Sequence, residues 1–269
     1  MKSHRMTLAF LLLVVIVVVV IVFVLAQMSV KQTLAYARAD LLVKTEWIKT
    51  HKVGEEYVLV DVRSSREYGR EHAEGAVSVP WQEFFEEGKF LGERCAEVLG
   101  KAGIRETDEV VVAGDEETGG TAIAFWVLDY LGHEKLHVLA EPVGELKSEG
   151  VAFVKAATRR EPVKYQAKVQ ADRLVEKTEG EVTVLLMPLE EGRGEGLREV
   201  NRLQQLWRAS SGGTREMDAY AAEIRGKEMD PKGRVVVCAE TWQGVAPQYL
   251  VLRVMGYERV GVCVKTAGK

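Results

Sequence analysis

Two segments of the chain match each other at a constant offset of 124 residues. Each combines a run of β-branched residues with a short loop and a helix-prone stretch, which is the order strand, loop, helix of an α/β fold. The matched segments are residues 110–122 and 234–246, and the match continues through Leu128 and Leu252, Gly132 and Gly256, and Glu134 and Glu258. The repeat predicts two copies of one α/β domain, in agreement with a length of 269 residues.

Strands alternate with helices along both copies. We expect strands at residues 57–60, 77–79, 109–112, 136–139, 182–186 and 258–264, and helices at residues 41–50, 94–101, 122–131 and 171–177. This alternation is typical of a mainly parallel sheet with helices on both faces. We place the first domain at residues 28–160 and the second at residues 161–269, with a linker at residues 157–166 that we expect to be solvated. Residues 190–227, charged and interrupted by glycines, match the first copy poorly.

An unbroken apolar run of 19 residues occupies positions 8–26. At about 1.5 Å per residue it is long enough to cross a bilayer core of about 30 Å. Lys2 and Arg5 before it predict a single-pass membrane protein with a cytoplasmic N-terminus and extracytoplasmic domains, periplasmic in a Gram-negative cell. We therefore assign residues 1–27 as an uncleaved signal anchor; the alternative is a signal peptide cleaved after Ala26.

The charge balance argues against a nucleic-acid partner. The net charge is −4 and the pI about 5.9, whereas phosphate binding needs a concentrated basic face. The short pair Arg159 and Arg160 is too small to form one.

Cys238 closes the β-branched run of the second copy, at a predicted turn from strand to helix. Backbone N–H groups and a helix N-terminus at such a turn stabilise a thiolate. At an offset of 124, the first copy has Gly114 in this place. Three cysteines leave at least one unpaired in an exported chain. We interpret the other two, Cys95 and Cys263, as small buried hydrophobic residues.

The first copy resembles a rhodanese domain of the sulfurtransferase family over about residues 41–150. The motifs that carry the resemblance are residues 59–63, Glu67 with Tyr68, residues 72–77 with Pro80, and residues 131–133 followed by Val138 and Leu139. The second copy resembles the same family mainly over residues 233–262. In tandem rhodaneses the N-terminal copy is usually inactive and the C-terminal copy carries the cysteine, so the resemblance implies catalysis in the second copy.

Four residues of the first copy are predicted to have structural roles. Asp61 and Arg63 lie two apart at a strand end, so both can point to one face and hold neighbouring loops through charge-assisted hydrogen bonds. His72 and Gly75 belong to the family motif. Because no second histidine or cysteine lies at ligand spacing from His72, we interpret it as structural and predict no metal site and no cofactor.

The resemblance implies a persulfide cycle on Cys238. Its thiolate would take sulfane sulfur from a small sulfur-containing anion such as thiosulfate and pass it to a thiol or another thiophilic acceptor. The backbone of the following loop would bind the anion. The predicted substrate-binding residues are Ala239, Glu240, Thr241, Trp242, Gln243 and Gly244.

The second copy departs from the family pattern. Glu240 is the only formal charge of the loop, and residues 186–189 stand where the family has an Asp and Arg pair. The related phosphatases carry an arginine six places after the cysteine, where this chain has Gly244, so the sequence argues against phosphoryl transfer. Trp242 either walls the pocket or packs between the domains.

The alternative function is a non-catalytic, membrane-anchored binding or scaffold module, with a membrane protein as its partner.

Overall fold

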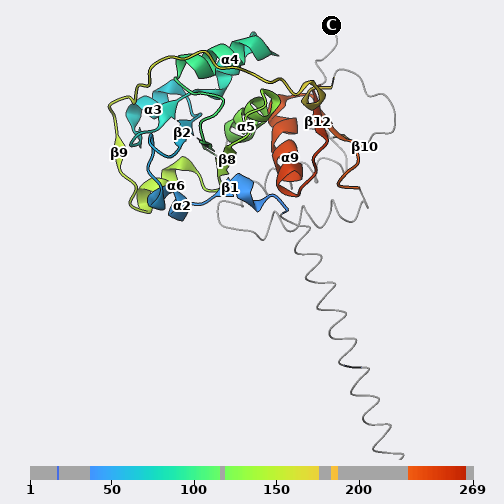
Figure 1. Ribbon diagram of the computed structural model, residues 1–269, viewed down its shortest axis with the longest axis horizontal. Coiled ribbons are helices and arrows are strands. Elements are labelled where there is room, and N and C mark those ends of the chain that lie inside the picture. The colour runs from blue at the N-terminus through green and yellow to red at the C-terminus, as the bar shows by residue number, and fades with distance from the viewer. Residues whose placement is uncertain (1–16, 18–36, 116–118, 176–182, 187–229, 265–269) are drawn as a thin grey trace, which may run out of the picture. The chain divides into compact units, whose positions relative to one another are not determined.

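The computed structural model describes residues 17, 37–115, 119–175, 183–186 and 230–264. Residues Arg38–Lys269 group into one compact unit, separate from Met1–Ala37. Within the larger unit, two sheets are formed by successive parts of the chain (Figure 1). The predicted domain division at residue 160 stays a prediction.

The N-terminal sheet has five strands in the order β1-β8-β7-β2-β4. Every neighbouring pair in it is parallel. The strands are β1 (Leu42–Val43), β2 (Val58–Asp61), β4 (Val77–Ser78), β7 (Val110–Ala113) and β8 (Leu136–Leu139). All residues of β2 and β7 are buried, because helices cover both faces of a parallel sheet and its central strands are therefore runs of Val and Leu.

Five helices accompany this sheet. They are α2 (Thr45–Thr50), α3 (Ser65–Arg70), α4 (Gly92–Lys101), α5 (Gly120–Tyr130) and α6 (Val143–Ser148). The 3₁₀ turns are η1 (Ala39–Leu41) and η2 (Trp81–Phe84). Two short antiparallel pairs complete this part: β3 (His72–Ala73) with β9 (Phe153–Val154), and β5 (Phe85–Glu86) with β6 (Lys89–Phe90). The predicted α/β class with a parallel sheet is confirmed.

The C-terminal sheet has three parallel strands among the described residues, in the order β10-β11-β12. They are β10 (Thr183–Leu186), β11 (Val235–Ala239) and β12 (Val260–Val264). Helix α9 (Trp242–Val254) connects β11 to β12 and packs against α5 of the N-terminal part (Figure 1). The turn η3 (Ala171–Arg173) precedes a bridge between Leu174 and Val262 at the outer edge of β12.

Strand register shows how closely the two sheets repeat. Val110 pairs with Val58 of β2 in the first sheet, and Val235 pairs with Thr183 of β10 in the second, so the central strands are related by an offset of 125. The following helices both end at an offset of 124, at Tyr130 and Val254. The segment from the central strand to the end of the following helix is therefore one residue shorter in the C-terminal part.

The predicted linker packs against the N-terminal part instead of lying free in solvent. Val163 N–H donates to the Gly100 carbonyl at 2.9 Å, and Lys168 N–H donates to the Leu131 carbonyl at 2.9 Å. Arg160, which we expected to be solvated, forms an ion pair with Asp108 at 2.9 Å. This segment is thus fixed along α4 and the end of α5 by backbone hydrogen bonds and a partly buried charge pair.

The predicted localisation as a single-pass membrane protein is corrected by the structure. No helix among the described residues is both long and apolar enough to cross a membrane. The longest of them, α9, has 13 residues and spans about 20 Å, less than the hydrocarbon core of about 30 Å. The predicted span at residues 8–26 lies, except for Val17, outside the described residues. We therefore do not retain the anchor, the extracytoplasmic placement or the membrane partner.

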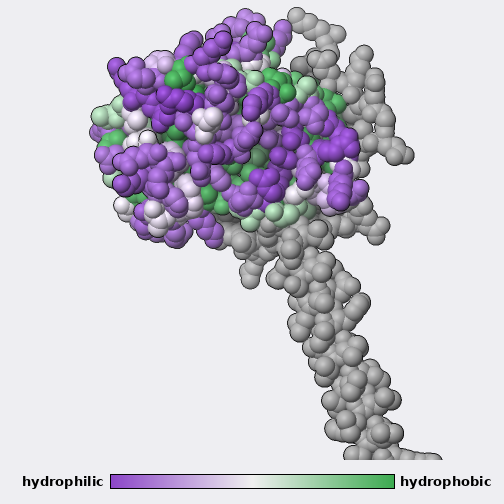
Figure 2. All heavy atoms as spheres, viewed as in Figure 1, coloured by the Kyte–Doolittle hydropathy of each residue, from purple (hydrophilic) through white to green (hydrophobic). Residues whose placement is uncertain are grey.

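The surface of the described residues is mainly hydrophilic on the face drawn in Figure 2. Hydrophobic residues appear there as small areas between charged and polar ones. Such scattered exposure is normal for a folded domain and does not mark a large apolar interface on this face.

Candidate functional site

Cys238 lies in the C-terminal half of strand β11, not in the loop after it. It pairs with Leu186 of β10 on one side and with Cys263 of β12 on the other. Its side chain is buried, with 3% of its surface exposed. By register it occupies the place of Ala113, the last residue of β7, because Ala113 pairs with Asp61 as Cys238 pairs with Leu186. The thiol is therefore one residue deeper in the sheet than the offset of 124 predicts.

Gly114, the residue directly after β7, has little room for a side chain. A Cβ atom built on Gly114 would lie 2.6 Å from the Thr121 hydroxyl oxygen and 2.9 Å from Val62 Cγ2. Both distances are shorter than real Cβ contacts. Packing thus excludes any larger side chain at this position unless Thr121 and Val62 move.

The six predicted substrate-binding residues are divided between a strand, a connection and a helix. Ala239 ends β11, Glu240 and Thr241 form the connection, and residues 242–244 belong to the first turn of α9. Thr241 is the N-cap residue, and its hydroxyl oxygen accepts a hydrogen bond from Gly244 N–H at 3.2 Å. The segment is therefore a short capped helix start, and one of its N–H donors is already satisfied by the cap.

A pocket of about 600 Å³ lies between this helix start and the N-terminal part. Four of the predicted residues line it: Glu240, Thr241, Trp242 and Gln243. The opposite wall is formed by residues that sequence reasoning did not select: Trp81, Gln82, Phe85, Gly88, Lys89 and Phe90. They come from η2 and the β5–β6 hairpin, whose short aromatic strands carry no periodic signal. Cys238, Ala239 and Gly244 do not line the pocket.

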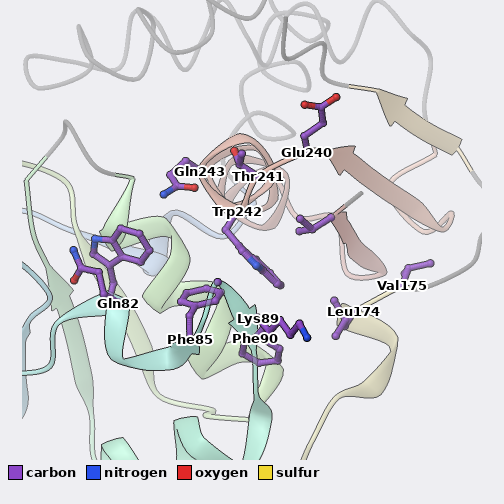
Figure 3. Close-up of a pocket in the computed structure, with 13 residues that line it drawn as sticks. Gln82, Phe85, Lys89, Phe90, Leu174, Val175, Glu240, Thr241, Trp242 and Gln243 are labelled. Carbon is purple, nitrogen blue, oxygen red and sulfur yellow. The ribbon is translucent and has the colours of Figure 1, made fainter. Parts of the chain in front are cut away.

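Trp242 is the centre of an aromatic cluster that joins the two copies. Its ring centroid lies 4.5 Å from that of Trp126, 5.4 Å from Phe85 and 5.4 Å from Phe90. Figure 3 shows its indole extending from the start of α9 toward Phe85 and Phe90. Trp242 also lines the pocket, so it both contacts aromatic residues of the N-terminal part and forms part of the pocket wall.

Two opposite charges lie at the pocket. Glu240 is exposed, and Figure 3 shows its carboxylate directed away from the aromatic residues. Lys89 of β6 lies beside Phe90 and supplies a cation that the predicted loop lacks. The indole Nε1 of Trp81, also in the lining, is buried without a hydrogen-bond partner. The lining of the pocket thus includes one cation, Lys89, and one carboxylate, Glu240.

Asp61 and Arg63 form a buried, bidentate ion pair. Arg63 Nη2 lies 2.6 Å from Asp61 Oδ2, and Arg63 Nε donates to Asp61 Oδ1 at 3.0 Å. Arg63 also donates to the carbonyl of Glu71 at 3.1 Å. Burial alone would lower the pKa of Arg63, but the hydrogen bond and charge of Asp61 raise it overall. The pair connects the end of β2 to the chain that follows α3. It does not line the pocket.

His72 and Gly75 are placed by packing in the same region. The His72 ring stacks on Tyr68 with centroids 3.6 Å apart, and its Nδ1 lies 2.8 Å from the Tyr68 carbonyl oxygen. Gly75 has φ +83°, and a Cβ there would lie 2.8 Å from Val53 Cγ1, so both its conformation and its surroundings require glycine. Within the part of the chain that the structure describes, no group of three or more candidate ligands could hold a metal ion.

The N-terminal sheet with its helices corresponds to a known family. Residues 44–145 match the family model of the rhodanese-like domain. The chain therefore contains an α/β domain with the rhodanese fold, and the resemblance predicted from the motifs of the first copy is confirmed for these residues.

The curated relatives of this chain have names that refer to sulfur transfer. A putative thiosulfate sulfurtransferase of Haloferax volcanii is 31% identical over 114 residues, which are 39% of this chain and 40% of the relative. The sulfur carrier protein TtuD of Thermus thermophilus is 24% identical over 166 residues, 60% of this chain and 58% of the relative. The chain thus spans about two fifths to three fifths of the length of these relatives.

Solved structures with similar folds extend beyond the matched domain. SseA from Escherichia coli, described as a 3-mercaptopyruvate sulfotransferase with the rhodanese fold, aligns with a TM-score of 0.70 and 15% identity over 85% of this chain and 99% of SseA. An EanB variant in complex with hercynine aligns with a TM-score of 0.65 and 16% identity over 84% of this chain and 66% of EanB. At these identities the likeness shows the fold alone.

Proposed function

We propose that the protein is a sulfurtransferase that carries sulfane sulfur as a persulfide on Cys238. The observation that carries the proposal is the place of this thiol near the carboxyl end of β11, two residues before Glu240 of the pocket wall. Ligands of open α/β sheets bind outside the carboxyl ends of the strands. The sulfur-transfer names of the curated relatives support the same chemistry.

The reaction takes place in two displacements. The Cys238 thiolate attacks the outer sulfur of thiosulfate; a new S–S bond forms while the S–S bond of thiosulfate breaks, and sulfite leaves with the electron pair. A thiolate acceptor then attacks the terminal sulfur, and the Cys238 thiolate leaves. Lys89 and the N-terminal turn of α9 lie at the wall of the pocket and favour an anionic ligand there, whereas Cys238 projects from the face opposite to Val264 of the same wall.

The test is the mass of the protein after incubation with thiosulfate. The full chain should gain one sulfur atom, and the variant Cys95→Ser should gain it equally. Cys95 is the matched control because its side chain is fully buried and burial raises the pKa of its thiol to about 12. Cys238→Ser should gain none and should form no thiocyanate from thiosulfate and cyanide. Equal sulfur uptake by Cys238→Ser and the unchanged chain rejects the assignment.

A binding module without turnover is the second candidate. Three observations favour it: only 3% of Cys238 is exposed, the thiol does not line the pocket, and the lining includes the negative charge of Glu240, which repels anions. In this case the pocket binds a ligand and Cys238 is a strand residue of the core. A Cys238 that resists both thiosulfate and alkylation in the folded protein supports this candidate against the sulfurtransferase.

A further inference from the structure

Cys238 has a second cysteine as its neighbour in the sheet. Cys263 of β12 is its register partner, whereas Cys95 lies in helix α4 of the other part. Neighbouring strands lie about 4.8 Å apart, and residues in register on parallel strands project from the same face. This Cα spacing lies within the range of about 4.4–6.8 Å in which two cysteines can form a bond between their sulfur atoms. The sequence could not show this neighbour, because β11 and β12 are separated by a helix.

The two thiols differ in their access to solvent. Cys238 is buried, with 3% exposed, whereas Cys263 is partly exposed. The next register pair, Ala239 with Val264, projects from the opposite face, and Val264 lines the pocket. Of the two cysteines on the shared face, Cys263 is therefore the one that a large acceptor reaches more easily.

We propose that Cys263 is a second sulfur-carrying residue, which takes the sulfane sulfur from the Cys238 persulfide and presents it to the acceptor. This inference rests on the proposed persulfide of Cys238. The Cys263 thiolate attacks the terminal sulfur; a bond forms between that sulfur and Cys263 Sγ, and its bond to Cys238 Sγ breaks with release of the Cys238 thiolate. The proton of the Cys263 thiol passes to solvent and is regained by Cys238. No oxidant or reductant is needed, because one S–S bond replaces another.

The experiment follows the position of the sulfur in the full chain. The protein is incubated with thiosulfate or with inorganic polysulfide, then alkylated and digested, and each cysteine peptide is examined for an added sulfur atom. The unchanged chain should carry sulfur at both Cys238 and Cys263. Cys263→Ser should carry it only at Cys238, and Cys238→Ser should carry it at neither site. Cys95→Ser should match the unchanged chain.

Other outcomes separate the two proposals. Sulfur at Cys238 but never at Cys263 overturns the relay and leaves the proposed function intact. Sulfur at Cys263 in Cys238→Ser, as much as in the unchanged chain, shows direct loading and also overturns the relay. Absence of sulfur from all cysteines overturns the proposed function and the relay together. Independently of any sulfur donor, the mild thiol oxidant diamide should link the Cys238 and Cys263 peptides, and failure to link them counts against the relay alone.

Discussion

At the scale of single residues, the buried pair of Asp61 and Arg63 was predictable from their spacing, but its environment was not. Two residues at positions i and i+2 of a strand end place both side chains on the same face in any fold. The sequence cannot state that Asp61 is 1% exposed or that Arg63 also reaches the Glu71 carbonyl, because both depend on how α3 returns to the sheet. Burial decides how much such a pair contributes to stability.

Arg63→Leu should lower the free energy of unfolding by about 3 kcal/mol, because it leaves the carboxylate of Asp61 buried without its partner. The matched control is Arg38→Leu. Arg38 makes the same bidentate contact with Asp40, two residues away, but their side chains are 45% and 58% exposed. An exposed pair contributes at most about 1 kcal/mol. Urea unfolding of both variants measures the difference, and equal losses would show that burial does not control the strength of the pair.

His133 predicts a pH dependence of stability. Its side chain is 3% exposed and lies between the Tyr165 hydroxyl at 2.9 Å and the Asp108 carbonyl oxygen at 3.0 Å. Burial lowers its pKa below the ordinary value of 6.5. The unfolded chain therefore binds a proton at this residue at a higher pH than the folded protein does, and stability falls as pH falls below about 6.5.

The variant His133→Gln isolates this effect from that of the other histidines. It should be less stable than the unchanged protein at pH 7.5, and the difference should narrow at pH 5.5, where the unchanged protein has lost part of the contribution of neutral His133. Urea unfolding at the two pH values gives both free energies. A difference that stays constant or widens at pH 5.5 would contradict the lowered pKa.

At the scale of elements, the hydrophobic pattern located most of the expected strands within one residue. Residues 109–112 and 136–139 were expected as strands, and β7 and β8 lie at Val110–Ala113 and Leu136–Leu139. Runs of valine and leucine between polar turns leave little choice of boundary. Strand β1, only two residues long, was hidden inside a predicted helix at residues 41–50, because two residues show no periodicity.

The start of α9 was harder to predict than any strand. Residues 239–244 include Gly244, which argues for a loop. The helix nevertheless begins at Trp242, because Thr241 caps it and Trp242 packs on the aromatic residues of the other part. A local sequence pattern includes the capping residue Thr241, but it does not show which distant aromatic residues Trp242 contacts. The sequence therefore indicates the residues of this segment but not the opposite wall of the pocket that they line.

Thr241→Ala should destabilise the protein by about 1 kcal/mol, because it removes the side chain that accepts the Gly244 N–H. Thr241→Ser keeps a hydroxyl oxygen in the same place and should retain nearly all of the stability. Thermal unfolding of the two variants, compared at one pH, gives the contribution of the cap. Equal stability of Thr241→Ala and the unchanged protein would mean that aromatic packing alone sets the start of α9.

At the scale of the whole molecule, helices α5 and α9 meet through residues that the sequence offset of 124 relates. The offset of 124 relates Phe125 to Tyr249 and Asp129 to Arg253. Each residue contacts its own counterpart: the rings of the first pair lie 6.3 Å apart, and Arg253 Nε lies 3.1 Å from Asp129 Oδ2. Helices α5 and α9 thus meet as two copies of one surface do in a symmetric dimer. Because the counterpart of Asp129 is Arg253, this contact is attractive, whereas two aspartates in the same places would repel each other.

Asp129 is the common partner of the groups at this junction. Tyr249 donates its hydroxyl to Asp129, and Arg173 Nε lies 3.6 Å from the same carboxylate. Its side chain and those of both arginines are 15% exposed or less. Burial first, and the negative charge of Asp129 second, raise the pKa of Tyr249 well above its ordinary value. A single carboxylate therefore compensates two mostly buried guanidinium groups.

Asp129→Ala should lower the free energy of unfolding by about 3 kcal/mol, because it leaves both guanidinium groups buried without a counter-charge. The loss should also weaken the coupling between the two sheets. Helix α9 packs on the C-terminal sheet and also on α5, so it connects that sheet to the N-terminal part. Far-ultraviolet circular dichroism and tryptophan fluorescence should report one urea transition for the unchanged protein and separate transitions for Asp129→Ala.

Glu134→Gln is the control, because Glu134 and its partner Lys168 are 80% and 73% exposed. Coincident transitions at an unchanged midpoint in Asp129→Ala would show that aromatic packing around Trp242, and not this charge cluster, holds the two copies together.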